Sequence, residues 1–140
     1  MQIIIDGRAL VMYGLGKGSF FGGTELYVQR LAHGLATLGH LVHVVTPDLE
    51  RCERRGDSEF WWGPGAFPTH ADCVVMVHSL EHLEPYSADL LVFATNGVDP
   101  DLGPQGQMAG PIDAFACFSQ NHVELLCKTR PTVKPEQCWV

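Results

Sequence analysis

Positive charge is scarce in this sequence and does not cluster. Nine Lys and Arg residues stand against sixteen Asp and Glu residues in a chain of 140, which gives a formal net charge of -7. Proteins that bind DNA or RNA present a basic stripe or patch to the phosphate backbone. The scattered basic residues therefore predict that nucleic acid is not a partner of this chain.

Long apolar runs are missing too. The apolar stretches 73–77 and 90–94 are far shorter than the roughly 20 residues that a membrane helix needs, so no transmembrane segment is expected. Residues 1–6 already have the pattern of a strand, which leaves no charged leader or apolar core for a secretion signal. The composition, 46% hydrophobic and 18% charged, is that of a folded globular chain.

The cysteines do not form an evident disulfide framework. There are five of them, an odd number, and no C-x-x-C motif occurs. Three lie inside apolar runs typical of strands or helices, so free thiols in a reducing compartment are the simplest interpretation. Together with the missing leader, this predicts a cytoplasmic protein.

Two well-known phosphate-binding motifs are absent as well. Residues 14–19, Gly-Leu-Gly-Lys-Gly-Ser, lack the last glycine of G-x-G-x-x-G, and their lysine is not followed by the Ser or Thr of a P-loop. The sequence supports neither NAD nor ATP, and no cofactor is expected. His78, Glu81 and His82 form an H-x-x-E-H pattern without a further ligand, so no metal site is expected either.

What the sequence does contain is a regular alternation of strand and helix patterns. Residues 2–6 are an almost unbroken β-branched run, as in a parallel strand buried on both faces. Apolar residues then recur at spacings of three and four, which predicts a helix over 25–38 with Thr24 as its N-cap and Gly39 after its end. A second strand is expected at 41–46, so the chain opens with a parallel βαβ unit.

The remainder continues this alternation. Segment 48–57 mixes both charge signs and is expected to be a solvated loop or short helix, and 79–86 a short helix or turn. Ser119 is expected to cap a second helix. Further strands are predicted at 58–62, 72–78, 88–95, 113–118 and 137–140. The predicted fold is a single α/β domain over 1–140, Rossmann-like and doubly wound, with a mainly parallel open sheet and helices on both faces.

The most informative short motif is Phe21-Gly22-Gly23-Thr24-Glu25, between the first strand and the long helix. Two glycines let a ligand approach the backbone, and a helix start offers unpaired N–H groups and a positive dipole end. These properties favour a phosphate site. An ordinary Gly-rich loop with a Thr cap explains the five residues about equally well.

Several stretches together resemble glycosyltransferase family 4. Residues 22–25 followed by 31–47 are similar to the family's opening: a Gly-Gly-x-Glu loop, a helix ending Leu-x-x-x-Gly-His, and then a strand. Residues 72–78 resemble the family's strand that begins with Asp and ends in His. Residues 113–119 and the helix after them resemble the elements before its interdomain hinge. The resemblance covers nearly the whole chain, in the family's order.

The resemblance implies a function. It identifies the chain as the N-terminal, acceptor-side domain of a GT-B enzyme that moves a sugar from a nucleotide-diphosphate donor to an acceptor with retention of configuration. The acceptor itself is unknown. Family members continue into a C-terminal donor-binding domain, which is absent from this chain, so the chain alone is expected to be inactive. The nucleotide sugar is then a co-substrate, and no bound metal is expected.

Candidate site residues follow from both lines of reasoning. Gly22, Gly23, Thr24 and Glu25 are candidates for binding the donor phosphates or the acceptor. His78 is a catalytic candidate, because ligand groups of an α/β sheet stand at the carboxyl ends of its strands.

One departure from the family concerns catalysis. Many members have Thr-x-His-Asn after the strand at 88–95, whereas here Thr95 stands at the histidine position and Asn96 follows it. Both are catalytic candidates, although Asn96 fits a turn equally well. The alternative function is a non-catalytic α/β binding or scaffolding domain that has lost the histidine. Candidates for lining the substrate are Phe21, Ser119 and His122. For His122, a position on the face of the helix without contact to a ligand is the better explanation.

Overall fold

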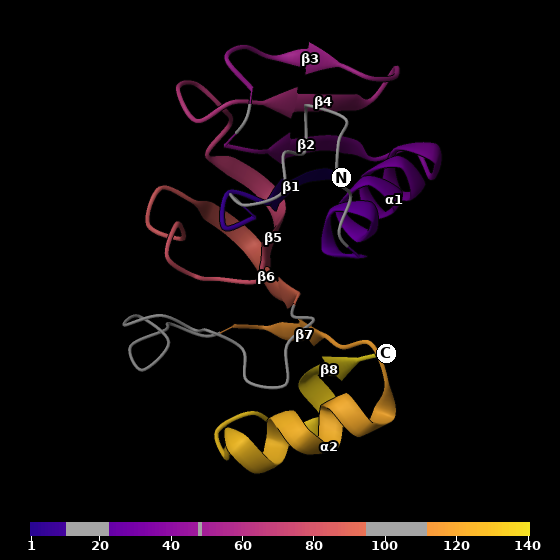
Figure 1. Ribbon diagram of the computed structural model, residues 1–140, viewed down its shortest axis with the longest axis vertical. Helices are drawn as coiled ribbons and strands as arrows, with labels where there is room; N and C mark the ends of the chain where they lie inside the picture. The colour runs from indigo at the N-terminus through magenta and orange to yellow at the C-terminus, as the bar shows by residue number, and fades with distance from the viewer. Residues whose placement is uncertain (11–22, 48, 95–111) are drawn as a thin grey trace.

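The computed structural model describes residues 1–10, 23–47, 49–94 and 112–140, and a twisted eight-stranded sheet runs through them (Figure 1). Its strand order is β3-β4-β2-β1-β5-β6-β7-β8, and every neighbouring pair is parallel except β3 with β4. The strands are β1 (Gln2–Asp6), β2 (Leu41–Val45), β3 (Glu53–Arg54), β4 (Glu59–Trp62), β5 (His70–Val77), β6 (Ser87–Ala94), β7 (Ala114–Ala116) and β8 (Cys138–Trp139).

Two helices cover opposite faces of this sheet. Helix α1 (Gly23–Thr37) packs Val28 and Ala32 into a cluster with Ile3 and Ile5. Helix α2 (Gln120–Thr129) packs on the other face, which carries Ile4. Figure 1 shows α1 beside β1 and β2, and α2 at the other end beside β7 and β8. The predicted α/β fold, with a mainly parallel sheet and helices on both faces, is confirmed.

The β-branched run of β1 explains its central place. Successive side chains of a strand point to opposite faces, and Ile3, Ile4 and Ile5 are all buried, so β1 needs cover on both sides. It receives that cover from the two clusters, and its two edges pair with β2 and β5. The polar residues of β1, Gln2 and Asp6, are therefore confined to its two ends.

The order of the strands defines a topological switch point. From β1 the chain proceeds to β2 and β4 on one side, then crosses to β5, β6 and β7 on the other. The connections from β1 and from β5 thus leave the carboxyl edge of the sheet in opposite directions, which opens the crevice where doubly wound sheets bind ligands. Asp6 and Val77 are the last residues of these two strands.

The first helix starts earlier than its pattern suggests. It begins at Gly23, so Thr24 lies within the first turn and is not the residue before the helix, and the prediction of Thr24 as N-cap is wrong. A glycine at the start of a helix carries no apolar signal, which hides it from a periodicity argument. Gly39, at φ +87°, has the left-handed conformation expected after the helix end.

The charged segment 48–57 contains a strand that was not expected. Its residues 53 and 54 form β3, which pairs antiparallel with β4. The guanidinium groups of Arg54 and Arg55 lie over the rings of Phe60 and Trp61, at 5.8 and 3.9 Å from their centroids. The long arginine side chains thus cover the aromatic strand β4, which charge patterning alone does not reveal.

The remaining elements follow the prediction with bounds that differ at their ends, β5 being longer and β4, β7 and β8 shorter than predicted. Segment 79–86 is a series of turns, and Ser119 caps α2, its Oγ accepting the backbone N–H of His122 at 3.2 Å. Strand β8 has two residues and follows a 3-10 helix, η2 (Pro135–Gln137). All five cysteines are free. In the described parts of the chain, no helix has the length and apolarity to cross a membrane.

Candidate functional site

At the switch point, a closed polar network joins β1 to the segment after β5. Asp6 is 2% exposed, and its carboxylate accepts from Arg8 Nε at 3.0 and 3.2 Å and from Arg8 Nη2 at 2.6 Å. The Tyr86 hydroxyl donates to Asp6 Oδ2 at 2.8 Å, and Arg8 Nη2 donates to the carbonyl of His82 at 3.1 Å. We call Asp6, Arg8 and Tyr86 the β1–β5 network.

Aromatic rings complete the enclosure of Arg8. Its guanidinium carbon lies 4.7 Å from the ring centroid of Phe67 and 5.6 Å from that of Tyr86. Burial and the neighbouring carboxylate of Asp6 raise the pKa of Tyr86 well above its usual value, so the phenol keeps its proton and remains a donor. A bidentate pair between a guanidinium and a carboxylate fixes geometry as well as charge, so the network holds the turns of 79–86 against the end of β1.

His78 immediately follows β5 and has an unusual backbone. Its φ is +72°, which makes it the one non-glycine residue in the left-handed region among the described residues. The backbone N–H of His78 donates to Ala94 at 2.9 Å, so the β5–β6 ladder continues into this residue. Such a conformation costs roughly 1–2 kcal/mol for an L-residue, and strain of this kind concentrates at functional sites. The side chain of His78 is exposed at the carboxyl edge.

The start of α1 combines an open backbone with a buried carboxylate. Gly23 is exposed, and a Cβ built on it would meet no atom within 4 Å. Thr24 is half-buried in the first turn. Glu25 is 1% exposed, and its Oε1 has no hydrogen-bond partner among the described residues. A ligand could therefore approach the backbone at Gly23, while Glu25 lies beneath the surface.

The junction between β7 and α2 is built from rings. His122 Nδ1 accepts the backbone N–H of Phe118 at 3.3 Å, and the two rings stack at an interplanar angle of 7°. Because Nδ1 accepts, the neutral imidazole carries its proton on Nε2, and Nε2 is buried without a partner among the described residues. Phe118 also meets Tyr27 of α1 edge-on, with centroids 5.3 Å apart. We call Phe118, Ser119 and His122 the β7–α2 junction.

The predicted site residues that are described all lie at the carboxyl edge. They come from the start of α1 (Gly23, Thr24, Glu25), the end of β5 (His78) and the β7–α2 junction (Ser119, His122). The contact between Tyr27 and Phe118 joins the first and last of these groups. Phe21, Gly22, Thr95 and Asn96 lie outside the described residues.

The β1–β5 network was not predicted from the sequence. An Asp and an Arg directly after a buried strand are a visible signal for a carboxyl-edge site, and Asp6-Gly7-Arg8 carries it. Tyr86 carries no such signal, because its partner Asp6 is 80 residues away in the chain.

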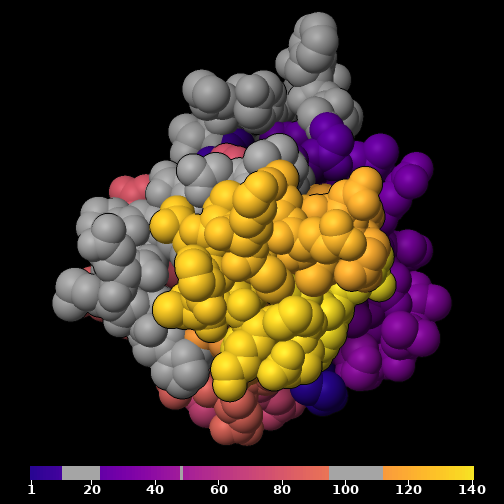
Figure 2. All heavy atoms as spheres, turned by 90° about the horizontal axis from the view of Figure 1, so that it is seen from below, coloured from indigo at the N-terminus to yellow at the C-terminus, as the bar shows by residue number. Residues whose placement is uncertain are grey.

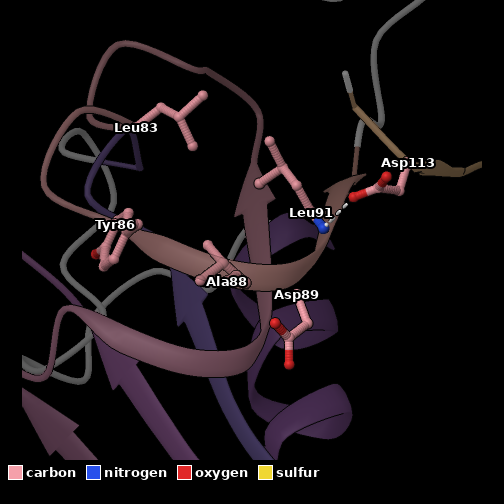
Figure 3. Close-up of a pocket in the computed structure, with 7 residues that line it drawn as sticks. Leu83, Tyr86, Ala88, Asp89, Leu91 and Asp113 are labelled. Atoms are coloured by element: carbon pink, nitrogen blue, oxygen red, sulfur yellow. Dashed lines mark hydrogen bonds between the residues drawn. The ribbon is translucent and has the colours of Figure 1, made fainter. Parts of the chain in front are cut away.

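A cavity lies on the α2 face and shares Tyr86 with the β1–β5 network. It has a volume of about 380 Å³, and Figure 3 shows the residues that line it: Val74, Leu83, Tyr86, Ala88, Asp89, Leu91 and Asp113. Ala88 and Asp89 lie at the start of β6, and Asp113 immediately precedes β7, so the cavity opens toward the amino ends of the strands. The Asp113 carboxylate already accepts the backbone N–H of Leu91 at 2.8 Å.

Comparisons with known proteins bear on the fold. No family model matches the chain, and no curated protein matches its sequence. Among solved structures, it is similar to a sucrose-phosphate synthase from Thermosynechococcus elongatus, with a TM-score of 0.66 and 11% sequence identity. The match covers 93% of this chain and 45% of that one, so the chain spans less than half of that structure's length. The likeness shows a shared fold, and the resemblance to family 4 stays a prediction.

Proposed function

We propose that this chain is the acceptor-side domain of a retaining glycosyltransferase that uses a nucleotide-diphosphate sugar as its donor. The observation that carries the proposal is the structural match, over 93% of the chain, to a sucrose-phosphate synthase. The name of that protein describes the joining of sugars, which is a glycosyl transfer. The resemblance of residues 22–25 and 31–47 to family 4 supports the same class and implies retention.

In this proposal the start of α1 stabilises the donor diphosphate. Its first N–H groups have no partner within the helix, and its dipole places partial positive charge at Gly23. Such donors are suited to the charge that develops on a leaving diphosphate. Because Glu25 is buried, its role is to support the helix start from beneath.

His78 is the proposed sugar contact at the reaction centre. Its exposed imidazole, directly after the strand next to β1, can hydrogen-bond a sugar hydroxyl. This would compensate for Thr95, which stands where many family members have histidine. The closed β1–β5 network supports His78 by holding the segment that follows it.

The donor in this proposal binds mainly to a second domain outside this chain. The 140-residue chain alone should then fold, show no sugar transfer, and bind free UDP with a dissociation constant no tighter than about 1 mM. A few contacts at one helix start cannot supply the roughly 8 kcal/mol of a micromolar site.

A direct test is an NMR titration of the isolated chain with UDP. The amide shifts should concentrate in the first turn of α1 and vanish in Gly23→Asp, because the new carboxylate stands where phosphate binds. Gly34→Asp is the matched control, since it adds the same charge to the same helix at an exposed glycine with open space. Shifts centred elsewhere, or a low-micromolar dissociation constant, would contradict the proposal.

The alternative function is a non-catalytic α/β binding or scaffolding domain, and the replacement of the family histidine by Thr95 favours it. An assay of the protein together with its donor domain distinguishes the enzyme from the non-catalytic domain. Turnover of a nucleotide sugar supports the enzyme, whereas UDP binding without turnover supports the alternative.

A further inference from the structure

Three thiols converge beneath α2. Cys117 directly follows β7, Cys127 lies in α2, and Cys138 begins β8. All three pack in the hydrophobic cluster on the α2 face. Figure 2 shows α2 and the segment after it, orange to yellow, side by side on one side of the molecule. The fold thus brings three cysteines from different elements into one cluster.

Cys138 has both other cysteines as neighbours in this cluster. Its thiol is near enough to interact with those of both Cys117 and Cys127. Its Sγ also lies 3.6 Å from the carbonyl oxygen of Lys134, to which it can donate. In the described ranges, no group of three His, Cys, Asp or Glu side chains is arranged to hold a metal ion. Neighbouring thiols can undergo thiol–disulfide exchange.

The strand ladder disfavours a bond between Cys117 and Cys138. Cys138 pairs with Phe115, which makes Cys117 its diagonal neighbour on β7. The backbone N–H of Cys117 donates to Trp139 at 2.7 Å, which fixes the two strands relative to each other. Diagonal neighbours on paired strands are about 7–8 Å apart, and a disulfide needs a Cα separation of about 4.4–6.8 Å.

Cys127 is under no such constraint. It lies on a helix that packs against the sheet through side chains, and no backbone ladder ties its position to that of Cys138. Cys127 and Cys138 are both half-buried, whereas Cys117 is 8% exposed, so a small reagent reaches the first two more readily. We propose that Cys127 and Cys138 form a disulfide that locks strand β8 to helix α2 when the protein meets a small-molecule disulfide such as oxidised glutathione.

The exchange balances without a metal or an electron carrier. The thiolate of Cys138 attacks one sulfur of oxidised glutathione, whose S–S bond breaks, and one glutathione leaves and takes up a proton. Cys127 then loses its proton and attacks the Cys138 sulfur, which releases the second glutathione. Two protein thiols are oxidised and one glutathione disulfide is reduced. Burial, together with the neighbouring thiols, raises the pKa of Cys138 to about 12, so the reaction is slow at neutral pH.

The test is incubation of the folded chain with oxidised glutathione, followed by digestion without reductant and mass spectrometry. We expect a cross-linked pair of peptides carrying Cys127 and Cys138, and a melting temperature raised by about 5 °C, because the short loop between them becomes constrained. Dithiothreitol should reverse both changes. Exposed Cys52 serves as the internal control, since it should take up a glutathione adduct in every sample.

Two variants sharpen the assignment of the pair. Cys117→Ser should keep the cross-link, and Cys127→Ser should replace it with a glutathione adduct at Cys138. The proposal fails if Cys52 is modified while Cys127 and Cys138 stay free, or if Cys138 in the unsubstituted protein pairs with Cys117. If a variant does not fold, mapping of the cross-linked peptides in the unsubstituted protein still tests the proposal.

Discussion

The two regions that flank the carboxyl edge satisfy their polar atoms in different ways. In the β1–β5 network, Asp6 accepts from both Arg8 and Tyr86, so charges and hydrogen bonds close on one another. At the β7–α2 junction, the rings of Phe118 and His122 stack, and His122 Nε2 is buried without a partner in the described residues. A closed network makes the surrounding fold rigid. An unsatisfied buried group lowers stability and remains able to form a hydrogen bond.

Breaking the closed network should give the largest effect. Asp6→Ala leaves the guanidinium of Arg8, 14% exposed, without its carboxylate, and removes the acceptor of Tyr86. We expect the free energy of unfolding to fall by about 3 kcal/mol, as measured by urea denaturation. Asp57→Ala, which breaks an exposed pair with Arg54, should leave stability unchanged. If both variants behave alike, the network is not the framework described above.

The substitution Gly23→Asp should come next, in a protein that includes the donor domain. Sugar transfer should fall by about 100-fold, because a carboxylate occupies the proposed phosphate position. Stability should change by no more than about 1 kcal/mol, since Gly23 is exposed, has no positive φ, and begins a helix where Asp is favoured. Initial rates and thermal melts measure the two effects. Near-normal transfer would mean that the glycine pair forms a turn and does not bind phosphate. The control Gly34→Asp should keep full activity.

At the β7–α2 junction, loss of the cap should have a smaller effect. Ser119→Ala removes the acceptor for the His122 backbone N–H and should lower the free energy of unfolding by about 1 kcal/mol. Ser119→Asp should restore most of this stability, because Asp caps a helix equally well. Urea denaturation compares the three proteins. An equal loss in both variants would point to packing of residue 119, and not its cap, as the source.

The smallest effect on stability is expected at His78, where the sign of the difference between two variants is informative. Gly adopts a positive φ without the penalty of a Cβ, so His78→Gly should be about 1 kcal/mol more stable than His78→Ala. At His82, which has no positive φ, the same pair of substitutions should favour Ala. Both variants at position 78 should lose transfer if the imidazole contacts the sugar. A glycine variant no more stable than the alanine variant would show that the backbone relaxes without strain.

Much of the fold could be predicted because its signals are local. The β-branched run of β1, the apolar spacing of α1 and the Ser119 cap each act within a few residues of sequence. Thr24 was wrongly predicted as a cap, because Gly23, where α1 begins, carries no apolar pattern. Strand β3 was not predicted, because its charged side chains cover an aromatic strand. Among the candidate residues, His78 followed from the general geometry of parallel sheets, whereas residues 22–25 followed from the glycine motif and the family resemblance.

The amino-acid sequence by itself determined the alternation of strands and helices, the polar residues that end the strands, and the Ser119 cap of α2. Only the tertiary structure decided that Tyr86 completes the Asp6–Arg8 pair, that His78 takes a left-handed backbone, and that Cys117, Cys127 and Cys138 pack in one cluster. Local patterns arise from neighbours three or four residues apart along a helix, or two along a strand. The other features depend on strand order and register, which bring together residues up to 80 positions apart.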